Sequence, residues 1–485
     1  MIKNERQYRI TKAQLDRFND ALKLAEASLD GQRDPLLKKV QLDALHSQYR
    51  ELADEVSEYE ALQASVPHVV EAESFDELPS ALIRARIASG LSQKELAERL
   101  GLKEQQVQRY EATNYSGASF ARLSEVIRAL GISVREDIFV PSNHLSITSF
   151  LVRLESFGLS KQFVKQRLFA DDLPSEQEID SEQNLAQIIF KAASALRRMF
   201  GWSLAEILGP TQPQLDLAIA GAARFKLPVR VADRSLSVYT VYAYHLSRLA
   251  LDATGGLTSQ PIPRDPIEVC RSIRAQYGEI SFRTALEYVW KLGVVVLPLD
   301  DPGAFHGACW RMLGRNVIVL KQRTKSEARW LFDLFHELWH AGEEPELNER
   351  TVLEMSETDI ERRKGEEERR ASKFAGNIVL DGRAETLVQM IVQETGGQIP
   401  HFKSALPRIA RRENTSIDSL ANYLAFRLSL QGENWWGTAN VLQTAGDPWL
   451  IARDIFLLKS DFSKLNTTDS ELLFRALEES SEVAA

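Results

Sequence analysis

One short segment most constrains how this chain folds, because it combines a signal that starts a helix with a signal that ends one. Ser92 and Glu95 have the spacing of a capping box, in which serine and a glutamate three residues later satisfy the first free amides of a helix. Gly101 ends this helix, because a residue without a Cβ atom lets the chain turn sharply. A second short helix follows from Lys103 to about Tyr110, which predicts a helix-turn-helix.

The surrounding residues supply a small core for these two helices. Apolar side chains recur at helical spacing from Leu82 to Leu130, and Gly131 ends the last predicted helix. A five-helix domain over residues 74–135 is therefore expected. The second helix of the helix-turn-helix, from Lys103 to about Tyr110, presents polar side chains to solvent, namely Lys103, Gln105, Gln106 and Arg109.

Residues 91–102, LSQKELAERLGL, and residues 107–111, VQRYE, resemble the XRE family of phage-repressor-like domains. The resemblance implies binding to double-stranded DNA, with Gln93 contacting a phosphate from an exposed helix N-terminus. Glutamine can bridge an adenine edge, and arginine or lysine can bind guanine or phosphate. The predicted DNA contacts are therefore Gln93, Lys103, Gln105, Gln106 and Arg109.

The alternative for this domain is a protein-docking platform without DNA binding. Glu98, Glu104 and Glu111 dilute the positive charge of the predicted DNA-facing side. Lys103 also stands where the family often has Ser or Thr as the helix cap, which weakens the assignment of individual contacts.

Two helical stretches with narrow apolar seams make up residues 1–66. Apolar residues at alternating spacings of three and four run from Leu15 to Leu29, and a similar series runs from Leu42 to Tyr59. We expect a helical hairpin or a dimerising coiled coil. A homodimer would read two half-sites of an operator-like DNA sequence.

Charge and cysteine content restrict the class of protein. The chain has 59 Lys and Arg against 68 Asp and Glu, a net charge of −9, so DNA contact must come from a local basic face. Cys270 and Cys309 are the two cysteines, which excludes a disulfide framework and a cysteine-based zinc site. No uncharged apolar run approaches the roughly 20 residues of a membrane span. A soluble cytoplasmic protein without membrane contact is expected.

The remaining chain divides into three predicted parts. Residues 143–255 keep a helical character and form a connector, whose role the sequence does not reveal. Strand-like apolar runs at 293–298 and 316–320 then predict a mixed domain over residues 262–440. A C-terminal helical tail covers residues 441–485, and its polar stretch after Asn466 is expected to fray. The predicted fold class is α+β, predominantly helical, with a small β-sheet.

His336 and His340 lie one helical turn apart, so both imidazoles project from the same face and can bind one Zn²⁺ ion. Glu337 lies beside them and can deprotonate a water molecule whose pKa the zinc has lowered. The alternative is a helix with two half-buried structural histidines. Weaker candidates are His306 and His401 for a catalytic role, and Asp333 for orienting a ligand imidazole.

Catalytic zinc usually takes three protein ligands, so a third is required. Residues 368–375, ERRASKFA, place Glu368 on the same helical face as Ala371 and Ala375. Together with residues 329–340, RWLFDLFHELWH, they resemble the ImmA/IrrE family of metallopeptidases. The resemblance implies a zincin-like domain in which Glu368 is the third ligand.

The neighbouring residues leave two points open. Glu366 and Glu367 compete with Glu368 for the role of third ligand. Ser372 and Asp381 stand where the family usually has Asn and often has Pro, respectively, which leaves the shape of the substrate groove open.

Two functions follow from these motifs. The first is a DNA-binding regulator with zinc-dependent endopeptidase activity, which cleaves a repressor or antitoxin-like protein in stress response, mobile-element control or a toxin-antitoxin system. The alternative is a transcriptional regulator or antitoxin whose metal site is structural or senses a ligand. The intact set of His336, Glu337, His340 and Glu368 favours the first.

Overall fold

The computed structural model describes residues 1–27, 45, 48–49, 52–53, 55–63, 75–134, 146–169, 182–209, 233–301, 305–322, 324–355 and 366–479. The chain forms two compact units, Met1–Phe139 and Val140–Ala485. Within the described ranges, no helix combines the length and the apolar character needed to cross a membrane.

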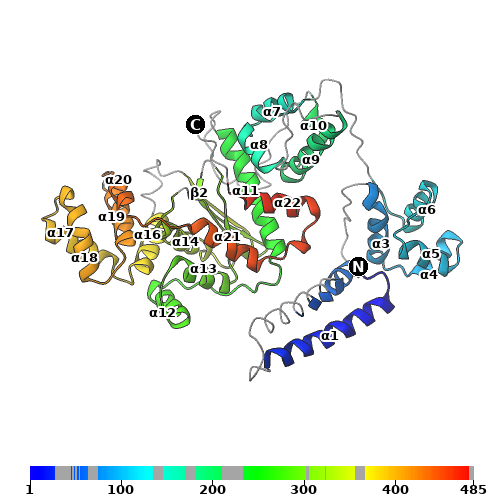
Figure 1. Cartoon of the computed structure of the whole chain (residues 1–485), viewed down its shortest axis with the longest axis horizontal. Helices are drawn as coiled ribbons and strands as arrows, with labels where there is room; N and C mark the ends of the chain where they lie inside the picture. Colours follow the sequence, from blue (N-terminus) through cyan, green and yellow to red (C-terminus); the bar gives the residue numbers. More distant parts are fainter. Residues whose placement is uncertain are drawn as a thin grey trace, which may run out of the picture. The chain divides into compact units, whose positions relative to one another are not determined.

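The first unit is helical throughout its described residues (Figure 1, blue to cyan). Residues 75–134 hold four α-helices after one 3-10 turn, rather than the five helices expected. The elements are α1 (Glu5–Ala27), η1 (Phe75–Glu77), α3 (Leu78–Ala88), α4 (Gln93–Leu100), α5 (Glu104–Ala112) and α6 (Phe120–Leu130).

The N-terminal residues share their core with the helix-turn-helix. Leu96 and Val107 are at most 1% exposed, and Ile2 and Tyr59 belong to the same buried cluster. The Tyr8 ring of α1 stacks on Tyr59, with ring centroids 5.0 Å apart. Part of the predicted hairpin, including residues 28–44, lies outside the described residues. What is described of residues 1–66 therefore packs as part of the DNA-binding unit.

The second unit is built around a four-stranded sheet with strand order β1-β3-β2-β4. Strand β1 runs parallel to β3, whereas β2 is antiparallel to both β3 and β4. Cys309 of β2 lies opposite Ile318 of β3 and Val352 of β4. The strands are β1 (Val295–Pro298), β2 (Phe305–Met312), β3 (Arg315–Leu320) and β4 (Arg350–Met355).

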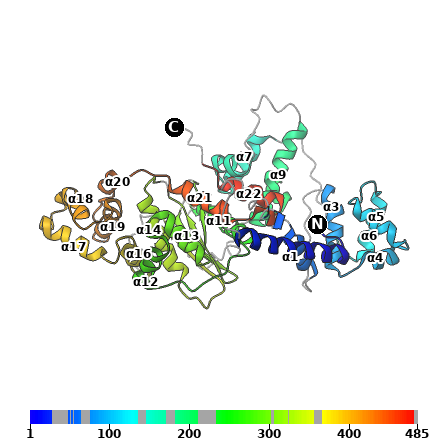
Figure 2. The same cartoon turned by 60° about the horizontal axis from the view of Figure 1, so that its bottom comes forward.

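Helices surround this sheet. Before it come α7 (Ile147–Ser156), α8 (Lys161–Arg167), α9 (Glu182–Phe200), α10 (Leu204–Leu208), α11 (Asp233–Ala253), α12 (Pro266–Tyr277) and α13 (Phe282–Lys291). From β3 onward come α14 (Glu327–Ala341), α16 (Glu366–Val379), α17 (Ala384–Thr395), η4 (Ile399–His401), α18 (Phe402–Arg412), α19 (Ile417–Ser429), α20 (Trp436–Val441), α21 (Pro448–Lys459), η5 (Phe462–Lys464) and α22 (Thr467–Ala476). Helices α17 to α20 lie together in both views (Figures 1 and 2).

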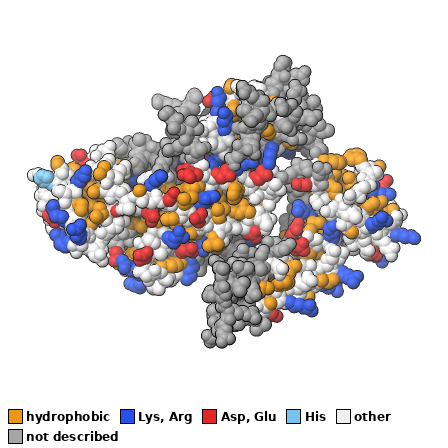
Figure 3. All heavy atoms as spheres, in the orientation of Figure 1, with side chains coloured by type: hydrophobic (Ala, Val, Ile, Leu, Met, Phe, Trp, Pro, Cys, Tyr) orange, Lys and Arg blue, Asp and Glu red, His pale blue; other side chains and the backbone are white. Residues whose placement is uncertain are grey.

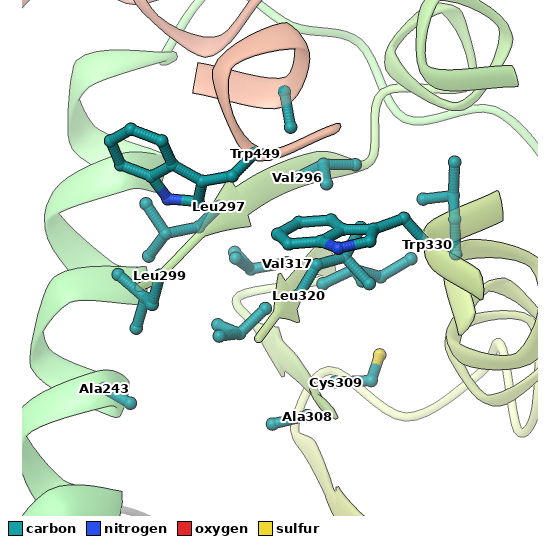
Figure 4. Close-up of a cluster of buried hydrophobic side chains, with 14 of the residues drawn as sticks. Ala243, Val296, Leu297, Leu299, Ala308, Cys309, Val317, Leu320, Trp330 and Trp449 are labelled. Atoms are coloured by element: carbon teal, nitrogen blue, oxygen red, sulfur yellow. The ribbon is translucent and has the colours of Figure 1, made fainter. Parts of the chain in front are cut away.

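Strands β1 and β3 are buried between helices because they are apolar on both sides. All four residues of β1 are buried, as are Val317 to Leu320 of β3. Figure 4 shows Ala243 of α11 and Trp330 of α14 on opposite sides of the strands, with Trp449 of α21 near β1. The runs expected as strands form β1 and β3, whereas β2 and β4 were not predicted.

The segment predicted as a connector belongs to this same core. Helix α11 packs against β1, β2 and β3, and α22 packs against α8, α9 and α11. Arg167 of α8 forms a buried ion pair with Asp301, 2.5 Å from Nε to Oδ1, and donates to the carbonyl of Glu478. The expectation of a frayed end was wrong up to Leu477, because Leu472 and Leu473 of α22 are at most 3% exposed.

Candidate metal centre and DNA-binding helices

Helix α14 carries the two histidines into the interior of the second unit. Ser326 caps it by accepting a hydrogen bond from the amide of Arg329 at 3.2 Å. The residues His336 and His340 are 3% and 1% exposed, and Glu337 is fully buried. Most of the other side chains buried along this helix are apolar, so its packing holds these three polar side chains inside the unit.

Two imidazole nitrogens and one carboxylate oxygen lie within 3.8 Å of one another beside α14. Nε2 of His336 lies 3.3 Å from Nε2 of His340 and 3.2 Å from Oε2 of Glu368. The third side of this triangle, from Nε2 of His340 to Oε2 of Glu368, is 3.8 Å. A tetrahedral zinc with bonds of about 2.0–2.2 Å separates its ligands by about 3.3–3.6 Å. The three side chains therefore fit a zinc ion.

Glu368 reaches this point from α16, which packs closely on α14. Ala371 and Ala375 are fully buried, as their predicted position on the contact face requires. Burial opposes a charge on Glu368, but hydrogen bonds with His336 and His340 outweigh it and hold the pKa of the carboxyl well below its usual value. The carboxylate is therefore in the ionised form that a metal requires.

The two competing glutamates lie elsewhere. Glu366 is exposed and pairs with Arg370 on its own helix. Oε1 of Glu367 lies 3.3 Å from Nδ1 of His340, which is the other nitrogen of that ring. Glu368 is thus the one of the three whose carboxylate is near Nε2 of both histidines.

The carboxylate of Glu337 lies directly against strand β2. A Cβ atom at Gly307 would overlap Oε1 of Glu337 and would come within 3.0 Å of its Cδ. Glycine at this position therefore makes room for the carboxylate. A role for Gly307 was not predicted from the sequence, because His306 was the candidate in this segment. The side chain of His306 lies outside the described residues.

Two further side chains support α14. The hydroxyl of Ser372 lies 3.2 Å from Nδ1 of His336, so this residue contacts a predicted metal ligand. Arg311 is buried and donates to the carbonyls of Ala341 at 2.6 Å and Glu343 at 2.9 Å. Its positive charge stabilises the C-terminal end of the helix.

Asp333, on α14 itself, accepts a hydrogen bond from Gln322.

In the first unit, the capping box and the turn are formed as predicted. The amide of Glu95 donates to Oγ of Ser92 at 3.2 Å, and the amide of Ser92 donates to Oε2 of Glu95 at 2.8 Å. Gly101 adopts a φ of +64°, the left-handed conformation that favours glycine. Lys103 is the N-cap of α5, where its amide donates to Oε1 of Gln106 at 3.0 Å.

Helix α5 exposes the polar side chains expected to face DNA. Lys103, Gln105, Gln106 and Arg109 are exposed, and Val107 is buried beneath them. On the face drawn in Figure 3, basic and acidic side chains are interspersed rather than gathered into one extended basic surface. Together with the net charge of −9, this favours DNA contact through a local set of residues such as this one.

Gln93 differs from its prediction. It is 7% exposed rather than exposed, because its Nε2 donates to Oε2 of Glu111 at 2.8 Å. Glu111 is fully buried and paired with Arg86, with Nε to Oε1 at 2.6 Å, so it does not dilute the charge of the surface. The phosphate contact predicted for Gln93 stays a prediction, and the expected exposure was wrong.

Comparison with known families locates one domain. A family model described as helix-turn-helix matches residues 82–136, which run from within α3 past the end of α6. The match supports an XRE-type domain and indicates that the chain is a DNA-binding regulator. No curated protein and no solved structure matches the chain.

Proposed function

We propose that this DNA-binding regulator is also a zinc-dependent endopeptidase. The observation that carries the proposal is the triangle of His336, His340 and Glu368, whose donor atoms lie 3.2, 3.3 and 3.8 Å apart. Two imidazoles and one carboxylate are a donor set of catalytic zinc, which leaves its fourth position for water or substrate.

The chemistry divides between the ion and the chain. When bound, zinc would lower the pKa of a water molecule and polarise a peptide carbonyl. Glu337 would take the proton from that water and return it to the amine that leaves when the peptide bond breaks. Its place beside His336 on α14, with the carboxylate against Gly307, suits that role.

The DNA-binding unit would determine where the protease acts. Exposed Lys103, Gln105 and Arg109 on α5 offer hydrogen bonds to base edges and phosphates of an operator-like site. We propose that a homodimer binds such a site, and that the substrate is a repressor or antitoxin-like protein found there. The DNA-binding unit thereby restricts the peptidase to a small set of proteins.

Replacing the proton acceptor alone tests the proposal. Glu337→Gln should retain zinc and DNA binding but abolish cleavage of the physiological target, because the amide cannot take a proton. Proteomes of cells that express the wild type or this variant would be compared under DNA damage or phage challenge. Glu366→Gln is the matched control, since Glu366 is exposed and pairs with Arg370.

The competing function is a regulator whose metal site is structural or senses a ligand. The observation that favours it is the family match, which is confined to residues 82–136. Identical cleavage products and an identical phenotype for the wild type and Glu337→Gln would refute the peptidase and support this function.

A further inference from the structure

Charged side chains surround the side of the His340 ring that faces away from Glu368. The nearest is Glu367, whose Oε1 lies 3.3 Å from Nδ1 of His340. The opposite nitrogen, Nε2, is the one that lies near His336 and Glu368. The imidazole of His340 is therefore held between two carboxylates from consecutive positions of α16.

Arg350 fixes Glu367 in this place. It is the first residue of β4, and its Nη2 lies 3.1 Å from Oε1 of Glu367 and 2.9 Å from Oε2 of Glu343. Its Nη1 also donates to the main-chain carbonyl of His340 at 2.9 Å. One guanidinium thus joins the first residue of β4 to both helices that carry the predicted metal ligands.

The same group of residues resembles a second cation site, but the structure favours a different role. Atoms of His340, Glu343 and Glu367 lie close enough together to hold an ion. However, the Arg350 guanidinium already lies within 3.1 Å of both carboxylates and offsets part of their negative charge. A second metal ion would have to displace it.

We propose that Glu367 and Arg350 are positioning residues of the metal centre. Glu367 would accept a hydrogen bond from the Nδ1 proton of His340, which leaves the lone pair of Nε2 for the metal and fixes the plane of the ring. Arg350 holds the Glu367 side chain, which is 50% exposed and would otherwise adopt other rotamers. This inference rests on the proposed zinc site.

Zinc affinity is the direct readout, because it reports ligand positioning without reference to catalysis. In the full-length protein, Glu367→Ala should weaken zinc binding by about 10- to 100-fold, the usual effect of losing a hydrogen-bond partner of a metal ligand. Glu367→Gln should restore most of this loss, because its side-chain oxygen can still accept from Nδ1. Arg350→Met should lower the affinity less than Glu367→Ala, since Glu367 itself remains.

Competition with a chelator of known zinc affinity would give these constants. The visible spectrum of the Co²⁺-loaded protein would report any change in ligand geometry. Glu366→Ala is the control, because it removes the same charge from the preceding position and Glu366 pairs with Arg370. Far-UV circular dichroism of each metal-free variant would check that the fold is intact.

The two possible failures are distinguishable. Equal zinc affinity and equal cobalt spectra for Glu367→Ala and Glu366→Ala would overturn the role of Glu367 and leave the proposed zinc site standing. Absence of zinc binding by the wild type would overturn the zinc site and this inference together.

Discussion

The buried ion pair between Arg86 and Glu111 predicts a large and local loss of stability when one partner is removed. Their side chains are 3% and 0% exposed, and the guanidinium donates to both carboxylate oxygens, at 2.6 and 2.8 Å. Arg86→Met would leave the Glu111 charge buried with Gln93 as its remaining side-chain donor. Breaking a buried pair in this way costs about 3–5 kcal/mol. That is a large part of the roughly 5–15 kcal/mol that stabilises a typical domain.

The distribution of tryptophan makes the loss measurable in the full chain. All eight tryptophans, from Trp202 to Trp449, belong to the second unit, so their fluorescence reports that unit alone. Far-UV circular dichroism reports helices of both units. In urea, with a slope of about 2 kcal/mol per molar, Arg86→Met should lower the midpoint of the first unit by about 2 M. The fluorescence transition should stay where it is.

A surface ion pair in the same unit is the control. Arg122 and Glu125 lie 2.5 Å apart with side chains 28% and 47% exposed, so Arg122→Met should cost less than about 1 kcal/mol. The double variant Arg86→Met/Glu111→Leu should recover much of the loss, because it leaves no buried charge. If Arg86→Met costs no more stability than Arg122→Met, or if the fluorescence transition shifts equally, the buried ion pair does not stabilise the first unit in this way.

Three further predictions follow from the two sites. Gly307→Ala should displace the Glu337 carboxylate and lower peptidase activity about 100-fold with zinc retained. Gly437→Ala is the control and should leave activity unchanged, because Gly437 has open space around it; equal activities of the two variants would contradict the packing argument. Gln105→Ala should reduce discrimination between operator and random DNA by about 1–3 kcal/mol in a gel-shift titration, and unchanged discrimination would remove it from the reading surface. Removing metal with a chelator should leave DNA affinity unaltered, because the predicted ligands lie in the second unit; loss of DNA binding would show that the metal supports both units.

Local signals in the sequence predicted the two helices of the helix-turn-helix and the turn between them. The capping box of Ser92 and Glu95 and the left-handed Gly101 act within a few residues, so their pattern is readable without the fold. The spacing of His336 and His340 is likewise a property of one helix. Glu368 came from a family resemblance, and the structure brings it to both imidazoles.

Contacts between segments far apart in the sequence could not be predicted from such local patterns. The burial of Gln93 depends on Glu111, 18 residues later, and on Arg86 from another helix. Gly307 matters because strand β2 passes beside Glu337, and nothing in the sequence near Gly307 indicates this pairing.

The C-terminal residues show the same limit of local patterns. Helix α22 was expected to fray because it contains several polar residues, yet its leucines pack into a core formed largely by α8, α9 and α11.

Metal analysis combined with zinc-edge X-ray absorption of the purified full chain would show whether two histidines and Glu368 hold a zinc ion. We expect about one zinc per chain, bound by imidazole nitrogen and carboxylate oxygen at about 2.0–2.2 Å, and its loss in His340→Ala. Absence of zinc from the wild type, full occupancy in the His336→Ala/His340→Ala variant, or a sulfur ligand at about 2.3 Å would contradict it.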